Sequence, residues 1–135
     1  MMQPPSVMET CLYVDDLERA EEFYSRVLGL TVYAKVEGRH TFFRSGGGVF
    51  LLFNPEQTRK QSPLGVPTHG ATGEGHVAFR MAEDEIEAWR ERLAQEKVEI
   101  ELEYTWPNGG FSFYFRDSAG NSVELVTPRT WGLEK

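Results

Sequence analysis

The chain has 135 residues, of which 40% are hydrophobic and 13% aromatic, and its formal net charge is −7. This apolar content is sufficient for a packed core and excludes an intrinsically disordered chain. The acidic charge repels nucleic-acid phosphate and anionic lipid, so we expect neither a nucleic acid nor a membrane as a partner.

The cysteine count and the first residues of the chain indicate the cellular compartment in which the protein is expected. Cys11 is the only cysteine, so no internal disulfide can form. The first residues lack the basic and then apolar pattern of a signal peptide, and no apolar run approaches the roughly 20 residues of a membrane helix. We therefore expect a cytoplasmic protein.

The first half of the chain predicts one helix and four strands. Alternating β-forming residues predict a strand over 8–14, and apolar residues at helical spacing then predict a helix that stops at Gly29. Glycines between the last two strands predict a hairpin. The three later strands are expected over 30–36, 40–44 and 49–53.

The second half repeats this plan after a segment without periodicity. Residues 55–74 hold several prolines and glycines, and we expect them to form a linker long enough to cover a site. The elements expected after the linker are a strand over 76–81, a helix over 83–95, and strands over 98–104, 111–116 and 122–126.

Each half is therefore a βαβββ module, and a sheet built from such modules carries its helices on one face. We expect an α+β fold in which the two modules form a cup-shaped, partly open mixed sheet with the helices on the outer face. The modules cover about residues 7–54 and 75–127. The chain, 1–135, is then a single domain.

Side-chain alternation along the strands places three ionisable residues on the sheet face that is turned away from the helices. The apolar residues of the strands belong under the helices, which leaves Glu9, His76 and Glu124 on the opposite face. Two carboxylates and one imidazole suit a divalent cation. Alignment of the two halves places Leu51 opposite Glu124, so one of the four matching positions is apolar.

Other residues are candidates for substrate contact or proton transfer. His69, in the linker, is a candidate proton carrier, and Glu124 is the second candidate catalytic group. Each candidate also has an ordinary structural interpretation, as a core, rim or solvent-facing residue. The expected substrate contacts are Tyr13, Arg80, Phe113 and Trp106.

Three segments carry a recognisable pattern: residues 14–30, 75–79 and 115–125. They resemble the vicinal oxygen chelate superfamily of glyoxalases, bleomycin-resistance proteins and extradiol dioxygenases. The resemblance implies paired βαβββ modules, often assembled as a homodimer, and one divalent metal held by His, Glu, His and Glu. Those four positions fall here on Glu9, Leu51, His76 and Glu124, and Leu51 cannot bind a metal.

The leading interpretation is an enzyme with one divalent metal ion (Zn, Ni, Fe, Mn or Co) that acts on a small oxygen-bearing organic substrate. Lyase or isomerase chemistry of the glyoxalase type and ring-cleaving dioxygenase chemistry both fit. The alternative is a metal-free protein that binds small molecules or sequesters an antibiotic, which Leu51 favours. A third possibility is a vestigial cleft in a domain that serves only assembly.

Overall fold

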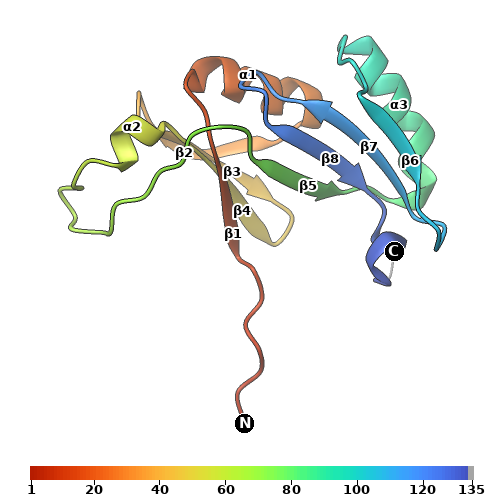
Figure 1. The fold of residues 1–135 in the computed structure, drawn as a ribbon, viewed down its shortest axis with the longest axis horizontal. Helices are drawn as coiled ribbons and strands as arrows, with labels where there is room; N and C mark the ends of the chain where they lie inside the picture. The colour runs from red at the N-terminus through yellow and green to blue at the C-terminus, as the bar shows by residue number, and fades with distance from the viewer. Residues whose placement is uncertain (134–135) are drawn as a thin grey trace. The chain divides into compact units, whose positions relative to one another are not determined.

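The computed structural model describes residues 1–133, which form two compact units (Figure 1). The division falls between Thr72 and Gly73, inside the segment expected to link the modules. Each unit is a βαβββ module, so the predicted α+β class is confirmed. None of the helices formed by residues 1–133 combines the length and the apolar character needed to span a lipid bilayer.

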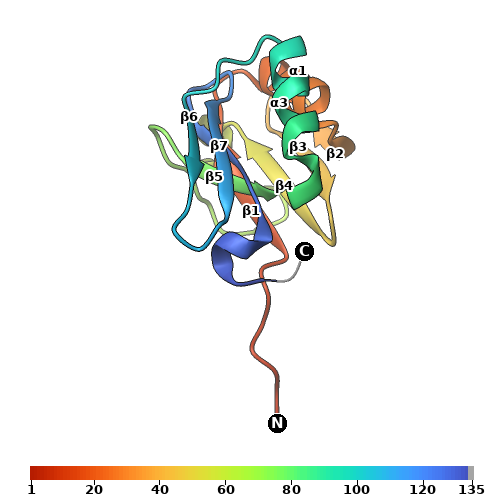
Figure 2. The same cartoon turned by 90° about the vertical axis from the view of Figure 1, so that its right-hand side faces the viewer.

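The first unit is built on an open four-stranded sheet in the order β1-β4-β3-β2. Strands β1 and β4 run parallel, and the other neighbouring strands are antiparallel. Residues 1–8 extend away from β1 in both views (Figures 1 and 2). The elements are β1 (Glu9–Tyr13), α1 (Leu17–Leu28), β2 (Thr31–Val36), β3 (His40–Ser45), β4 (Gly48–Phe53) and α2 (Pro55–Thr58).

Helix α1 ends at the glycine that the sequence predicts, and a side-chain cap marks its start. The Asp16 side chain accepts the N–H of Arg19 at 3.1 Å, and Gly29 ends the helix with a φ of 73°. Tyr24 is fully buried, and its ring packs against Phe50 with 5.0 Å between centroids. Helix α1 therefore covers the sheet face that carries Phe50.

We expect Asp16→Ala to lower the free energy of unfolding by about 1 kcal/mol, because it removes the side-chain acceptor at the start of α1. Urea denaturation followed by circular dichroism measures this loss. Asp16→Asn keeps a capping oxygen and should stay close to the parent chain. An equal loss in both variants would show that the cap is not the cause.

The second unit repeats the first, with the sheet order β5-β8-β7-β6 and a parallel pair formed by β5 and β8. Helix α3 lies along this sheet (Figure 2), and the Arg90 guanidinium is 5.3 Å from the centroid of Phe113. The elements are β5 (His76–Arg80), the 3-10 helix η1 (Glu83–Glu85), α3 (Ile86–Gln95), β6 (Leu102–Thr105), β7 (Phe111–Arg116), β8 (Ser122–Val126) and the 3-10 helix η2 (Pro128–Trp131).

Two segments differ from the sequence prediction. Residues 55–74, expected to lack regular structure, begin with α2, whose four residues are too few to show helical periodicity. The strand expected over 98–104 begins at Leu102. The reason is that Lys97 takes a left-handed φ of 59° and the N–H of Val98 bonds back to a carbonyl of α3, so the chain leaves the helix in a tight turn.

Candidate functional site

His76 and Glu124 lie side by side on neighbouring strands of the second unit. In the β5–β8 ladder His76 pairs with Ser122, and Glu124 pairs with Ala78, so both belong to the same face of the sheet. The Nε2 atom of His76 is 3.3 Å from Oε1 of Glu124. The structure thus brings together two of the three predicted metal ligands.

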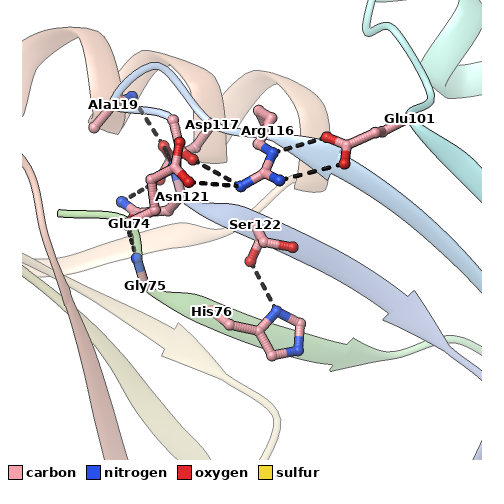
Figure 3. Close-up of polar contacts among 10 residues, drawn as sticks. Glu74, Gly75, His76, Glu101, Arg116, Asp117, Ala119, Asn121 and Ser122 are labelled. Carbon is pink, nitrogen blue, oxygen red and sulfur yellow. Dashed lines mark hydrogen bonds and ion pairs between the residues drawn. The ribbon is translucent and has the colours of Figure 1, made fainter.

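A backbone hydrogen bond determines which His76 nitrogen carries the proton. Nδ1 lies 3.0 Å from the carbonyl oxygen of Ser122, which can only accept, so Nδ1–H is the donor (Figure 3). In the neutral imidazole Nε2 then holds a lone pair, and this lone pair faces the carboxylate of Glu124. Such electron-rich atoms repel each other unless a cation or a proton lies between them.

Glu124 is only 7% exposed, and its second carboxylate oxygen is held by a hydroxyl. Ser112 Oγ lies 2.5 Å from Glu124 Oε2, and Ser112 is completely buried. The indole Nε1–H of Trp106 donates to the same Ser112 Oγ at 2.8 Å. Oε2 is therefore engaged in a hydrogen bond with Ser112, and Oε1 is the oxygen that faces His76.

Tyr114 is a further member of this cluster. It pairs with Glu124 in the β7–β8 ladder, and its ring stacks on that of His76 with 6.4 Å between centroids. Burial, followed by the charge of Glu124 and a hydrogen bond to it, raises the pKa of the Tyr114 phenol. The phenol therefore keeps its proton at neutral pH and can donate a hydrogen bond beside the carboxylate.

The sequence analysis did not single out Ser112 or Tyr114. Both alternate along β7 with phenylalanines that face α3, and this alternation was the available signal. Phe113, expected to contact substrate, is on the other side: it is fully buried and pairs with Leu125 under α3. That expectation is wrong, because one step along a strand moves a side chain to the opposite face.

The remaining predicted residues of the second unit lie on the Glu124 face. Trp106 reaches Glu124 through Ser112, and its ring meets Tyr104 edge-on at 4.7 Å between centroids. Arg80 is the last residue of β5. Its side chain is exposed and lies on the same sheet face as that of His76. Trp106 thus contacts the carboxylate network, whereas Arg80 lies further along the strand.

In the first unit, Glu9 and Leu51 occupy the positions that His76 and Glu124 occupy in the second. Leu51 lies opposite Cys11, two residues after Glu9, in the parallel β1–β4 pair. Glu124 lies opposite Ala78, two residues after His76, in the parallel β5–β8 pair. Glu9 is exposed and Leu51 is 7% exposed.

His69 is held against the first sheet. The hydroxyl of Tyr13 lies 2.6 Å from Nδ1 of His69, and the His69 ring packs edge-on against Phe53 with 4.8 Å between centroids. Burial and the neighbouring thiol of Cys11 raise the pKa of Tyr13. Side chains alternate along β1, so those of Glu9 and Tyr13 lie on the same face of the sheet. His69, which contacts Tyr13, therefore lies on the face that carries Glu9.

The match to known proteins covers most of the chain. The family model for the Glyoxalase/Bleomycin resistance protein/Dioxygenase superfamily matches residues 6–125. The chain belongs to this superfamily. The solved structure of a lactoylglutathione lyase from Agrobacterium tumefaciens is similar to this superfamily member, with a TM-score of 0.93. The two sequences are 40% identical, and the match covers 98% of this chain and 100% of the lyase chain.

Two transferases are also similar to this glyoxalase-superfamily chain. Metallothiol transferase FosB from Staphylococcus epidermidis is 29% identical over 127 residues, which cover 93% of this chain and 84% of FosB. Glutathione transferase FosA from Serratia marcescens is 28% identical over 123 residues, covering 89% and 79%.

His76 and Glu124 of this superfamily member are both of residue types that bind divalent ions, and they meet in the second unit. One imidazole nitrogen and one carboxylate oxygen are aimed at each other, and each is fixed from behind by a hydrogen bond, as metal ligands commonly are. Leu51 offers no donor at the fourth position. In the part of the chain that the structure describes, neither unit alone gathers three His, Cys, Asp or Glu side chains into a possible ion site.

Proposed function

We propose that this protein binds one divalent metal ion and acts on a small oxygen-bearing organic molecule. The observation that carries the proposal is that His76 Nε2 lies 3.3 Å from Glu124 Oε1, while Nδ1 of His76 is bonded to a backbone carbonyl. A transition-metal ion such as Zn, Ni, Fe, Mn or Co accepts both atoms as ligands and removes their repulsion. Glu9 is the proposed third ligand.

When bound, the ion supplies Lewis-acid stabilisation for negative charge that develops on a substrate oxygen. Glu124 and His69 are the proposed proton carriers, and the protonated Tyr114 phenol is placed to donate a hydrogen bond near Glu124. Tyr13 and Arg80 are the proposed substrate contacts on the open faces of the two sheets.

The names of three relatives support a narrower substrate class. They are a lactoylglutathione lyase, a glutathione transferase and a metallothiol transferase, and each name refers to a thiol or a thiol conjugate. We therefore place lyase, isomerase or transferase chemistry on an oxygen-bearing compound or its thiol adduct ahead of ring cleavage. A homodimer in the cytoplasm stays a prediction.

Metal analysis of protein purified without chelator tests the proposal. We expect close to one bound divalent ion per chain, and its return on titration after the ion has been stripped with a chelator. His76→Ala should abolish this binding. A parent chain that takes up none of the five ions in calorimetric titration would contradict the proposal.

Leu51 favours a second candidate function, a metal-free protein that binds or sequesters a small molecule. An apolar, nearly buried residue at the fourth family position removes one charge-bearing ligand. This candidate predicts tight binding of an unaltered compound that chelators do not affect and that His76→Ala leaves intact.

Leu51→Glu distinguishes the two functions. Under the metal proposal it restores a carboxylate at the position that matches Glu124, and we expect metal affinity to rise by about 10-fold or more, because another ligand charge is added. Calorimetric titration of Leu51→Glu against Leu51→Gln, which has the same size but no charge, measures the effect. Equal affinities in both variants would contradict a role of position 51 in metal binding.

A further inference from the structure

We infer that Ser112 and Trp106 are positioning residues, which hold Glu124 so that its Oε1 is presented to the metal. The inference rests on the proposed function and changes the role of Trp106. The sequence analysis expected a substrate contact at this residue, whereas its indole nitrogen donates a hydrogen bond to Ser112 at 2.8 Å.

The chemistry of the three groups gives the hydrogen-bond chain a direction. An indole N–H can only donate, so Ser112 Oγ is the acceptor in its bond with Trp106. The hydroxyl of Ser112 has one proton of its own, which it donates to Glu124 Oε2, 2.5 Å from Ser112 Oγ. The chain therefore runs from the indole through the hydroxyl to the carboxylate. Each donor in it strengthens the next, since Ser112 and Glu124 are both buried.

The turn after β6 holds the Trp106 indole in place. The backbone N–H of Trp106 donates to the carbonyl of Gly110 at 2.7 Å, and the N–H of Gly109 donates back to the Trp106 carbonyl at 2.9 Å. Within the same turn, the side-chain amide of Asn108 donates to the carbonyls of Arg129 and Thr130 at 3.0 Å. The indole therefore extends from a backbone that is fixed at both ends.

Fixing Oε2 has a consequence for the ligand atom. A free glutamate side chain rotates about its last bond and exchanges its two oxygens, whereas Ser112 holds one of them. Oε1 is thereby kept on the side of His76 before any ion arrives. Loss of outer hydrogen bonds of this kind typically costs about 10- to 100-fold in metal affinity.

The test measures Co²⁺ affinity by calorimetry for Ser112→Ala, Trp106→Phe and the double variant, with thermal unfolding of each metal-free protein as a check of folding. We expect Ser112→Ala to bind Co²⁺ about 10- to 100-fold more weakly and Ser112→Thr, which keeps the hydroxyl, to recover most of the loss. Trp106→Phe should lose less, and it should have no further effect once Ser112 is absent. Trp131→Phe, at an exposed site, is the control.

A spectroscopic readout separates positioning from general packing. Zn²⁺ should shift the Trp106 indole N–H resonance in ¹H–¹⁵N spectra through the Ser112 hydroxyl, while the resonances of Trp89 and Trp131 stay in place. The shift should disappear in Ser112→Ala.

The outcomes keep the two proposals apart. Parent-like Co²⁺ affinity in folded Ser112→Ala, or in Trp106→Phe if Ser112→Ala does not fold, would overturn the positioning role and leave metal binding intact. A parent chain that binds neither Co²⁺ nor Zn²⁺ would overturn the proposed function itself.

Discussion

Glu124→Gln is expected to weaken divalent-metal binding by at least about 100-fold, beyond the effect typical of an outer hydrogen-bond partner. The substitution removes the buried carboxylate whose Oε1 lies 3.3 Å from His76 Nε2. The amide oxygen can still accept from Ser112, and the amide N–H₂ can donate to the lone pair of His76. The metal-free fold should therefore keep its stability while the metal affinity is lost.

Two measurements check this separation. Calorimetric titration gives the affinity, and thermal unfolding with and without the ion gives the stabilisation, which should be present in the parent chain and absent in Glu124→Gln. The control is Glu99→Gln, an exposed residue between α3 and β6, which should match the parent. If the ion stabilised Glu124→Gln as much as the parent chain, Glu124 would not be a metal ligand.

Asp117→Ala is expected to lower the free energy of unfolding by about 3 kcal/mol, because a buried carboxylate with several partners is removed. Its Oδ1 accepts the N–H groups of Ala119 and Asn121, both at 2.9 Å, and its Oδ2 accepts the side-chain amide of Asn121 at 3.0 Å. Asn121 in turn accepts the N–H of Gly75 at 2.7 Å (Figure 3). The carboxylate thus joins the β7–β8 turn to the start of β5.

Urea denaturation followed by tryptophan fluorescence measures the loss. The control is Asp84→Ala, an exposed carboxylate in η1, where a change within about 0.5 kcal/mol is expected. Because the strands that carry His76 and Glu124 begin beside this turn, Asp117→Ala should also weaken metal binding to a smaller extent. Parent-like stability in Asp117→Ala would show that water replaces the carboxylate at no cost.

Strand alternation was sufficient to predict that His76 and Glu124 share a sheet face, because the side-chain period of two leaves no freedom once the apolar face is known. The same rule, applied to β7, identifies Ser112 and Tyr114 on that face. Phe113 was predicted to contact substrate because of its aromatic ring, although its position along β7 places it on the opposite face. The start of β6 was predicted wrongly for a different reason: no residue type in the segment favours the left-handed turn at Lys97.

The periodic apolar residues and the turn glycines determined the two βαβββ modules, because these patterns depend only on the geometry of neighbouring residues along the chain. The tertiary structure alone decided how the carboxylate of Glu124 is held. The contact of Ser112 Oγ with Oε2, the indole donor of Trp106 and the Ser122 carbonyl that directs His76 depend on strand register. Register joins residues far apart in sequence, and composition or spacing along the chain does not specify which atoms meet.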